Sequence, residues 1–156
     1  MIAEQLGLNF QNISLSPITL KDTDNIEHTF SFQTRLLGYQ VIIEAKEHLD
    51  DDKQGYEFSV IGNIDDDLFD VFKILFERIR RALSQKHIEP CDLIDNRITN
   101  QDTVRAYITC NSEGDRERPM LVIDGKEIQW HEFGEMLSVY EGFNFKLEIF
   151  DKTEER

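Results

Sequence analysis

Hydrophobic and polar positions alternate along residues 28–36, with the period of two that is typical of a half-buried β-strand. The side chains that share its apolar face are Phe30, Phe32, Thr34 and Leu36. The same alternation returns in residues 39–46 and 56–60, and glycines stand between or after these stretches. The pattern predicts three consecutive strands of an antiparallel sheet. Residues 1–27 are weakly patterned, with one short strand expected at 12–15.

In the next segment apolar positions recur every three or four residues, which is the spacing of an amphipathic helix. The main stripe contains Leu68, Phe72, Leu75, Ile79 and Ala82. A second apolar stripe lies beside it, and a face this wide belongs against a sheet. Aspartates crowd the start of the segment and basic side chains crowd its end, as the helix dipole favours. We predict a helix over residues 67–87.

The second half follows a similar order of elements. Residues 89–102 contain a proline and several Asn and Asp residues, which is typical of a connection. A strand is expected over residues 104–110, and a hairpin over residues 120–129. The Asp124-Gly125 pair suits a two-residue hairpin turn, because that turn needs positive φ at both positions.

A second helix begins at Trp130 in this interpretation, and Gly142 is suited to end it in the left-handed conformation. Residues 143–150 then alternate again, which predicts a final strand. The side chains expected to face inward are Phe143, Phe145, Leu147 and Ile149. The order βββα–βββαβ defines an α+β fold, with antiparallel sheet and two helices.

The element order also suggests how the chain is divided. We predict a βββα lobe over residues 1–88, a connection over residues 89–102 and a βββαβ lobe over residues 103–156. One compact domain that contains both lobes is the alternative, because a chain of 156 residues fits either organisation.

The charge of the chain bears on its partners. At a formal net charge of −14, its surface repels nucleic-acid phosphates and anionic lipid at long range, which argues against nucleic acid or a membrane as partner. Residues 1–10 lack the features of a signal peptide, and no stretch approaches the ~20 apolar residues that span a bilayer. We therefore expect a cytoplasmic protein whose two cysteines are reduced thiols.

Basic side chains cluster at the end of the first predicted helix, against the overall charge. They are Arg78, Arg80, Arg81, Lys86 and His87. As a binding site, the cluster would take a phosphate, a nucleic-acid end or an acidic protein. As a structural feature, it balances the helix dipole while its long side chains cover apolar surface. We prefer the structural interpretation, because this pattern is the one that helix C-termini favour.

A second candidate lies at the start of the second helix. Trp130, His131 and Glu132 would form an aromatic-walled pocket in which His131 or Glu132 acts as acid or base. The alternative is that Trp130 packs in the core while the polar side chains face water. Gly134 costs a helix about 1 kcal/mol relative to Ala, so we expect close packing at that position. No third catalytic partner is visible, and the structural interpretation is preferred.

Metal and cofactor motifs are incomplete. His131-Glu132 begins like a zinc-protease motif, but Glu135 stands where the second histidine ligand is required. Asp50 begins a sequence that is similar to a calcium loop, but Ile61 replaces its bidentate acid. Nucleotide-binding and nucleophile motifs are missing from the sequence. We predict no metal and no cofactor.

Three long strings carry a resemblance to a known family. They are HTFSFQTRLLGYQVIIEAKE, GYEFSVIGNIDDDLFDVFKILFERIRRAL and IDGKEIQWHEFGEMLSVYEGFNFKLEIFD. Together they resemble an uncharacterised bacterial family that is described as a domain of unknown function, over most of residues 28–151. The resemblance implies a bacterial, cytosolic origin. It implies no activity, because no catalytic residues are assigned to the family.

Three functional hypotheses follow. The first is a non-catalytic binding or regulatory module that acts through protein contact, with a protein partner or with a second copy as a homodimer. The second is a small enzyme or ligand-binding protein that uses His131 and Glu132, with Glu141 as a further candidate. The third is nucleotide or nucleic-acid binding through Arg78, Arg80, Arg81 and Lys86. We favour the first, because no complete catalytic set is visible.

Overall fold

The structure, a computed structural model, describes residues 16–110 and 117–154. The chain divides into two compact units. Unit 1 comprises Met1–His48, Glu57–Ser84 and Phe150–Arg156, and unit 2 comprises Leu49–Tyr56 and Gln85–Ile149. The strand expected at residues 12–15 lies outside the described residues.

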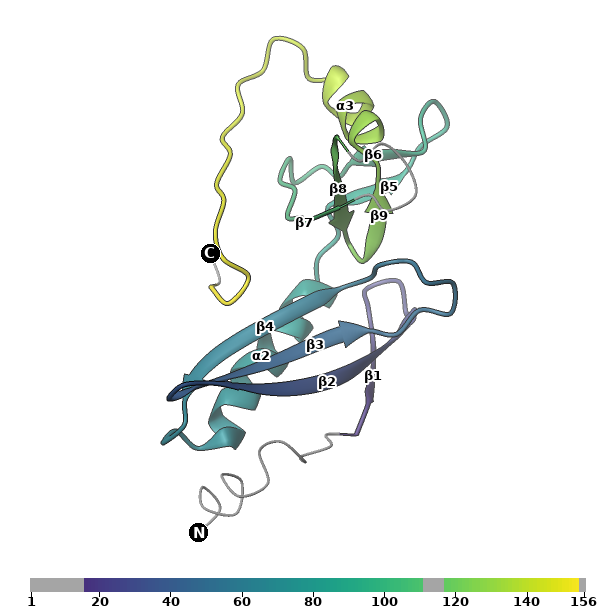
Figure 1. Cartoon of the computed structure of the whole chain (residues 1–156). Coiled ribbons are helices and arrows are strands. Elements are labelled where there is room, and N and C mark those ends of the chain that lie inside the picture. Colours follow the sequence, from purple (N-terminus) through teal and green to yellow (C-terminus); the bar gives the residue numbers. More distant parts are fainter. Residues whose placement is uncertain (1–15, 111–116, 155–156) are drawn as a thin grey trace. The chain divides into compact units, whose positions relative to one another are not determined.

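Unit 1 contains a four-stranded antiparallel sheet in the order β1-β2-β3-β4 (Figure 1). Its strands are β1 (Ile18–Lys21), β2 (Glu27–Leu37), β3 (Gln40–Glu47) and β4 (Glu57–Asn63). The three strands β2 to β4 are those that the alternation predicts, and β1 adds an edge. Pairing places Ile43 of β3 beside Thr34 and Val60. One face of the sheet therefore gathers the alternating apolar positions of all three strands.

The helix α2 (Leu68–Leu83) covers that face. Asp67 caps its N-terminus by accepting a hydrogen bond from the Phe69 N–H, which satisfies one of the unpaired donors of the first turn. The Phe72 ring meets Phe32 of β2 edge-on, with 5.1 Å between ring centroids. The helix side chains that are buried are Leu68, Val71, Leu75, Ile79 and Leu83. The predicted helix is confirmed, although it ends four residues earlier than expected.

Helix and sheet meet most closely at Gly62 in β4. A Cβ atom built on Gly62 would lie 2.7 Å from Cγ2 of Val71. The stiff, buried Val71 side chain has no room to turn away, so this position accepts no side chain without displacing α2. The need for a glycine here comes from packing and not from its backbone conformation.

In its described residues, unit 2 contains two small antiparallel sheets and one helix. The strands are β5 (Ile88–Pro90), β6 (Asn96–Ile98), β7 (Tyr107–Cys110), β8 (Pro119–Ile123) and β9 (Lys126–Ile128), and the helix is α3 (Trp130–Ser138). β5 and β6 pair with each other within the segment that the sequence suggests to be a connection. β8 and β9 form the predicted hairpin, with φ of 53° at Asp124 and 77° at Gly125. The α+β class is confirmed.

The core of unit 2 joins its sheets to its helix. Its buried members are Ile88, Leu121, Ile123, Ile128 and Met136. The Asp124 carboxylate accepts hydrogen bonds from the backbone N–H groups of His87 and Ile88, at 2.7 and 3.0 Å. The hairpin turn therefore also fixes the start of β5, which explains why an aspartate in the left-handed conformation is buried here.

The final strand predicted over residues 143–150 is wrong. This segment is extended but belongs to no sheet, and its apolar side chains face solvent instead of a core. Alternation indicates an extended backbone with two chemically different faces. It does not supply the neighbouring strand that a sheet requires. Figure 1 shows the segment as a thin yellow trace that leaves the end of α3.

The close packing expected at Gly134 is also wrong. A Cβ atom at this position of α3 would meet nothing within 4 Å in the described part of the chain. The cost of a glycine inside the helix is therefore not offset by a close contact there. Gly62 and Gly134 therefore differ: the contact with Val71 leaves no room for a side chain at Gly62, whereas a side chain at Gly134 would meet no neighbouring atom within 4 Å in the described residues.

We expect the same exchange to have opposite effects at these two glycines. Gly62→Ala should lower the free energy of unfolding by roughly 1–3 kcal/mol, because the added methyl group overpacks the contact with Val71. Gly134→Ala should raise it by up to about 1 kcal/mol through helix propensity alone. Urea unfolding followed by far-UV circular dichroism and by Trp130 fluorescence measures both. Destabilisation by Gly134→Ala, or tolerance of Gly62→Ala, would contradict this packing.

Candidate functional site

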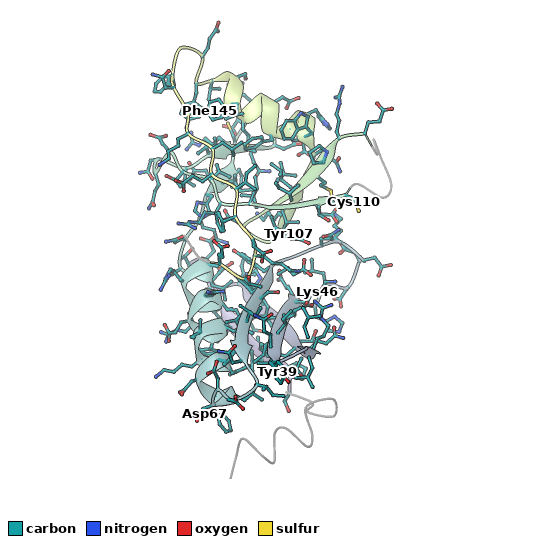
Figure 2. The ribbon with its side chains drawn as sticks, turned by 60° about the vertical axis from the view of Figure 1, so that its left-hand side comes forward. Tyr39, Lys46, Asp67, Tyr107, Cys110 and Phe145 are labelled. Carbon is teal, nitrogen blue, oxygen red and sulfur yellow. The ribbon has the colours of Figure 1, made fainter. Side chains whose placement is uncertain are left out.

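An extended segment of unit 2, residues 143–149, exposes several apolar side chains, and we call it the exposed strand. Phe143, Phe145, Leu147 and Ile149 are each between 70% and 82% exposed. Figure 2 shows the Phe145 side chain on this trace. Soluble proteins seldom expose contiguous apolar side chains in this way unless the surface meets a partner.

The backbone of the exposed strand is available for pairing. The Phe143 N–H donates to the Tyr140 carbonyl group, which closes the turn after α3. In the described residues, the backbone groups of residues 144–149 make no hydrogen bond. On the polar face, Lys146 Nζ lies 3.0 Å from Glu148 Oε1, as expected for side chains two positions apart on an extended chain. The segment thus has the shape of a β-strand without a neighbour.

The residues before the exposed strand hold its start in place. Gly142 has φ of +92° in the left-handed region, but the prediction that it caps the helix is wrong, because α3 already ends at Ser138 with Val139 as its C-cap. The rings of Tyr140 and Phe143 meet edge-on, with 5.5 Å between their centroids. The Tyr140 hydroxyl donates to Asp102 Oδ1 at 3.1 Å. Burial, with this hydrogen bond to Asp102, raises the pKa of Tyr140.

The residues after the exposed strand are fixed within unit 1. Arg78 of α2 donates from Nη1 to the Thr153 carbonyl oxygen at 2.7 Å and to the Ser59 carbonyl oxygen of β4 at 2.8 Å. Asp151 accepts hydrogen bonds from the backbone N–H and the hydroxyl of Thr153, which lower the pKa of Asp151. Each flank of the exposed strand is therefore held by contacts within its own unit.

The basic cluster predicted from sequence spans the boundary between the two units. Arg78 is half-buried and holds backbone carbonyl groups, so it serves the fold. Arg80 and Arg81 lie in the last turn of α2. Lys86 and His87 follow the helix and belong to unit 2, where His87 donates from Nδ1 to the Thr103 carbonyl oxygen. The five residues thus divide between two units, because α2 ends at Leu83.

Arg80 does line a hollow of about 290 Å³ in unit 1. Lys21 at the end of β1 contributes a second cation, and Thr23 and Ser84 contribute hydroxyl groups. Leu20, Asp22 and Leu83 complete the lining. Two cations beside the Thr23 hydroxyl and apolar surface suit a small anion, whereas the Ser84 hydroxyl already donates to the Arg81 carbonyl oxygen. The sequence did not indicate this grouping, since Lys21 lies in a weakly patterned segment.

The second predicted group serves the start of α3. Glu132 accepts a hydrogen bond from the Gln129 N–H at 3.1 Å, and the Gln129 side chain accepts one from the backbone in return. This capping box satisfies two donors of the first helical turn. Trp130 is partly exposed and packs on Phe133, with 6.1 Å between ring centroids. His131 is exposed to solvent. The arrangement therefore gives Glu132 a structural role at the start of the helix.

Unit 1 contains a buried charged cluster that sequence reasoning missed. His28 of β2 bonds through Nε2 to Asp22 Oδ2 at 2.7 Å and through Nδ1 to Glu47 Oε2 at 2.5 Å. The side chains of His28, Asp22 and Glu47 are only 11%, 1% and 5% exposed. Asp22 Oδ1 also accepts the backbone N–H groups of Asp24 and Ile26, which shapes the turn between β1 and β2. The cluster ties that turn to β3.

The cluster favours a positive imidazolium ring. An ionised carboxylate only accepts hydrogen bonds, so both contacts are complete hydrogen bonds when both ring nitrogens of His28 carry protons. The hydrogen bond to Glu47 raises the pKa of His28, burial opposes it, and the bond to Asp22 adds to the rise. Because both ring nitrogens are hydrogen-bonded, His28 is not placed to act as a general base. Its role is structural, since it links Asp22 in the turn after β1 to Glu47 in β3.

The described part of the chain gathers no set of metal ligands. Among residues 16–110 and 117–154, no group of three or more His, Cys, Asp or Glu side chains is placed to hold a metal ion. Both cysteines are free thiols. In the same ranges, neither helix has the length and apolar character to cross a membrane.

Comparison with known families accounts for most of the chain. Residues 11–84 match the model of a domain of unknown function, DUF7686, and residues 87–154 match that of a second, DUF7713. The two matches adjoin where the structure divides unit 1 from unit 2, at Ser84 and Gln85. No curated protein and no solved structure matches the chain. The resemblance to a domain of unknown function is confirmed, as two adjoining domains without an assigned activity.

We expect the stability that His28 provides to depend on pH. Its pKa is higher in the folded chain than the unfolded value of about 6.5, so the stabilisation is complete below about pH 6.5 and disappears as pH rises through the folded value. Glu47→Gln should therefore lower the free energy of unfolding by about 1.5–3 kcal/mol below pH 6.5, and by much less at high pH. Urea unfolding across the pH range measures the difference.

The matched control for this experiment is Glu27→Gln, the same exchange at an exposed position of β2. It should leave the free energy of unfolding nearly unchanged at every pH. If the free energies of unfolding of wild type and Glu47→Gln differ by the same amount at every pH, the contact between His28 and Glu47 does not depend on the protonation of His28, which contradicts the prediction.

Proposed function

We propose that the chain is a non-catalytic binding module that acts through protein contact, and that the exposed strand of residues 143–149 is its contact element. The observation that carries the proposal is the combination of four exposed apolar side chains with unpaired backbone groups on one anchored segment. An extended segment of this kind binds by adding a strand to a partner, because main-chain hydrogen bonds supply affinity and alternate side chains supply specificity.

The geometry of the flanks supports this proposal. A segment that is held at both ends has fewer conformations to lose on association than a tail with a free end. The turn at Gly142 and the contact of Arg78 with Thr153 hold the two flanks. The apolar side chains of the exposed strand then supply the buried area, and the partner supplies the hydrogen bonds that residues 144–149 lack.

The hollow beside Arg80 favours a second candidate, the binding of a small anion such as the phosphate of a nucleotide. Lys21 and Arg80 supply its positive charge, and the hydroxyl groups of Thr23 and Ser84 lie on the same lining. The exposed pair of Arg80 with Glu77, at 3.7 Å, is weak enough to exchange for a ligand.

The contact proposal is tested by capturing partners on the immobilised full chain. Phe145→Ser with Leu147→Ser should reduce a stoichiometric, nuclease-resistant protein partner by at least about tenfold, because two exposed apolar side chains near a contact centre carry much of its affinity. The control removes two apolar side chains elsewhere, Tyr39→Ser with Leu93→Ser, at positions 86% and 93% exposed. Equal retention by both double variants would contradict the role of the exposed strand.

The anion proposal is tested with inorganic pyrophosphate, titrated into the full chain and followed by calorimetry. Binding should weaken with salt, and Lys21→Ala or Arg80→Ala should weaken it by at least about tenfold through loss of a charge-assisted hydrogen bond. Lys73→Ala, an exposed cation elsewhere on α2, is the control. Heat of binding that is unchanged in both hollow variants would rule out this site.

A further inference from the structure

The sequence of the exposed strand is complementary to itself. Antiparallel pairing of two copies about a two-fold axis places residue i of one copy opposite residue j of the other, with the sum of i and j constant. An odd sum sets apolar side chains opposite polar ones, because a slip of one residue reverses the faces. Only even sums bring the apolar faces of both copies to the same side.

Charge selects one arrangement among the even sums. A pair centred on Lys146 sets the Lys146 side chains of the two copies opposite each other, so that two positive charges meet. A pair centred on Glu148 does the same with two negative charges. A pair centred on Phe145 sets Lys146 opposite Asn144 and forms no ion pair. A pair centred on Leu147 sets Lys146 of each copy opposite Glu148 of the other. Opposite charges across a strand pair stabilise it, and like charges do the reverse.

The same arrangement matches the apolar face. Centring on Leu147 places Phe145 opposite Ile149 of the other copy, twice, and the two Leu147 side chains opposite each other. Aromatic side chains facing β-branched ones are among the favourable cross-strand pairs. Phe145, Leu147 and Ile149 are each exposed in the single chain and so are available for the contact.

We infer that the partner of the exposed strand is a second copy of this chain, paired antiparallel about Leu147 with reciprocal Lys146–Glu148 contacts. This inference rests on the proposed function, and it names the partner. The contact is isologous, so the same surface serves both copies and the assembly closes as a dimer. Because a two-stranded ribbon is marginally stable in water, we expect a dissociation constant on the order of 100 μM, within reach of sedimentation.

Charge exchange tests the pairing on the full chain. Lys146→Glu alone and Glu148→Lys alone should each raise the dissociation constant by at least about tenfold, since each replaces two opposite-charge pairs by two like-charge pairs. The double exchange should restore it to within about threefold, because it swaps the two charges and again sets a cation opposite an anion in both contacts. Lys126→Glu, an exposed position of β9, makes the same change in net charge as Lys146→Glu and should have little effect.

Cysteine cross-linking tests the register independently of affinity. In a chain with Cys91→Ser and Cys110→Ser, Leu147→Cys should oxidise to a disulfide-linked dimer, because Leu147 faces its own copy. Phe145→Cys should cross-link at least about tenfold more slowly. In this register residue 145 of one copy lies opposite Ile149 of the other, several residues away from residue 145 of that second copy. Equal rates would overturn the register.

The outcomes separate this inference from the proposed function. A chain that stays monomeric at millimolar concentration, or a dimer insensitive to both charge exchanges, overturns self-pairing. If such a chain still captures another protein, and loses it in Phe145→Ser with Leu147→Ser, the contact function stands with a different partner. If the wild-type chain neither forms a dimer nor captures a protein partner, both the inference and the proposed function are overturned. The same holds if it does either one but no variant of the exposed strand changes the result.

Discussion

The packing of α2 against the four-stranded sheet is the interaction on which unit 1 depends. Its close approach at Gly62 brings Val71 into the core, and the same helix directs Arg78 to the carbonyl groups of Ser59 and Thr153. The position of the C-terminal flank is therefore a consequence of a helix–sheet contact far away in the sequence. Arg78 makes this link through donors that a lysine would not arrange in the same plane.

The sequence predicts the parts of this fold that follow from local periodicity. The strands β2 to β4 and α2 are long and regular enough to be read directly, and the Asp124-Gly125 turn is specified by its two residues. The short strands β5 and β6 leave no comparable pattern, because three residues do not establish a period. Their existence depends on tertiary contacts such as the Asp124 carboxylate.

The candidate site was less predictable for the same reason. The alternation in residues 143–149 is visible in the sequence, but whether a strand finds a neighbour depends on the whole chain. Likewise His28 meets carboxylates that lie 6 and 19 positions away, and no local pattern connects them. The basic cluster is a different case, since residues that are adjacent in sequence belong to two different units.

The polar face of the exposed strand has a consequence for solubility. An extended apolar segment with open edges is a template for unlimited stacking, and charged side chains within such a segment oppose that growth. Lys146 and Glu148 are the charged side chains within the exposed strand, and the chain as a whole has a net charge of −14. Because electrostatic self-repulsion grows faster than the number of copies that join, the acidity of the whole molecule favours small closed assemblies over fibrils.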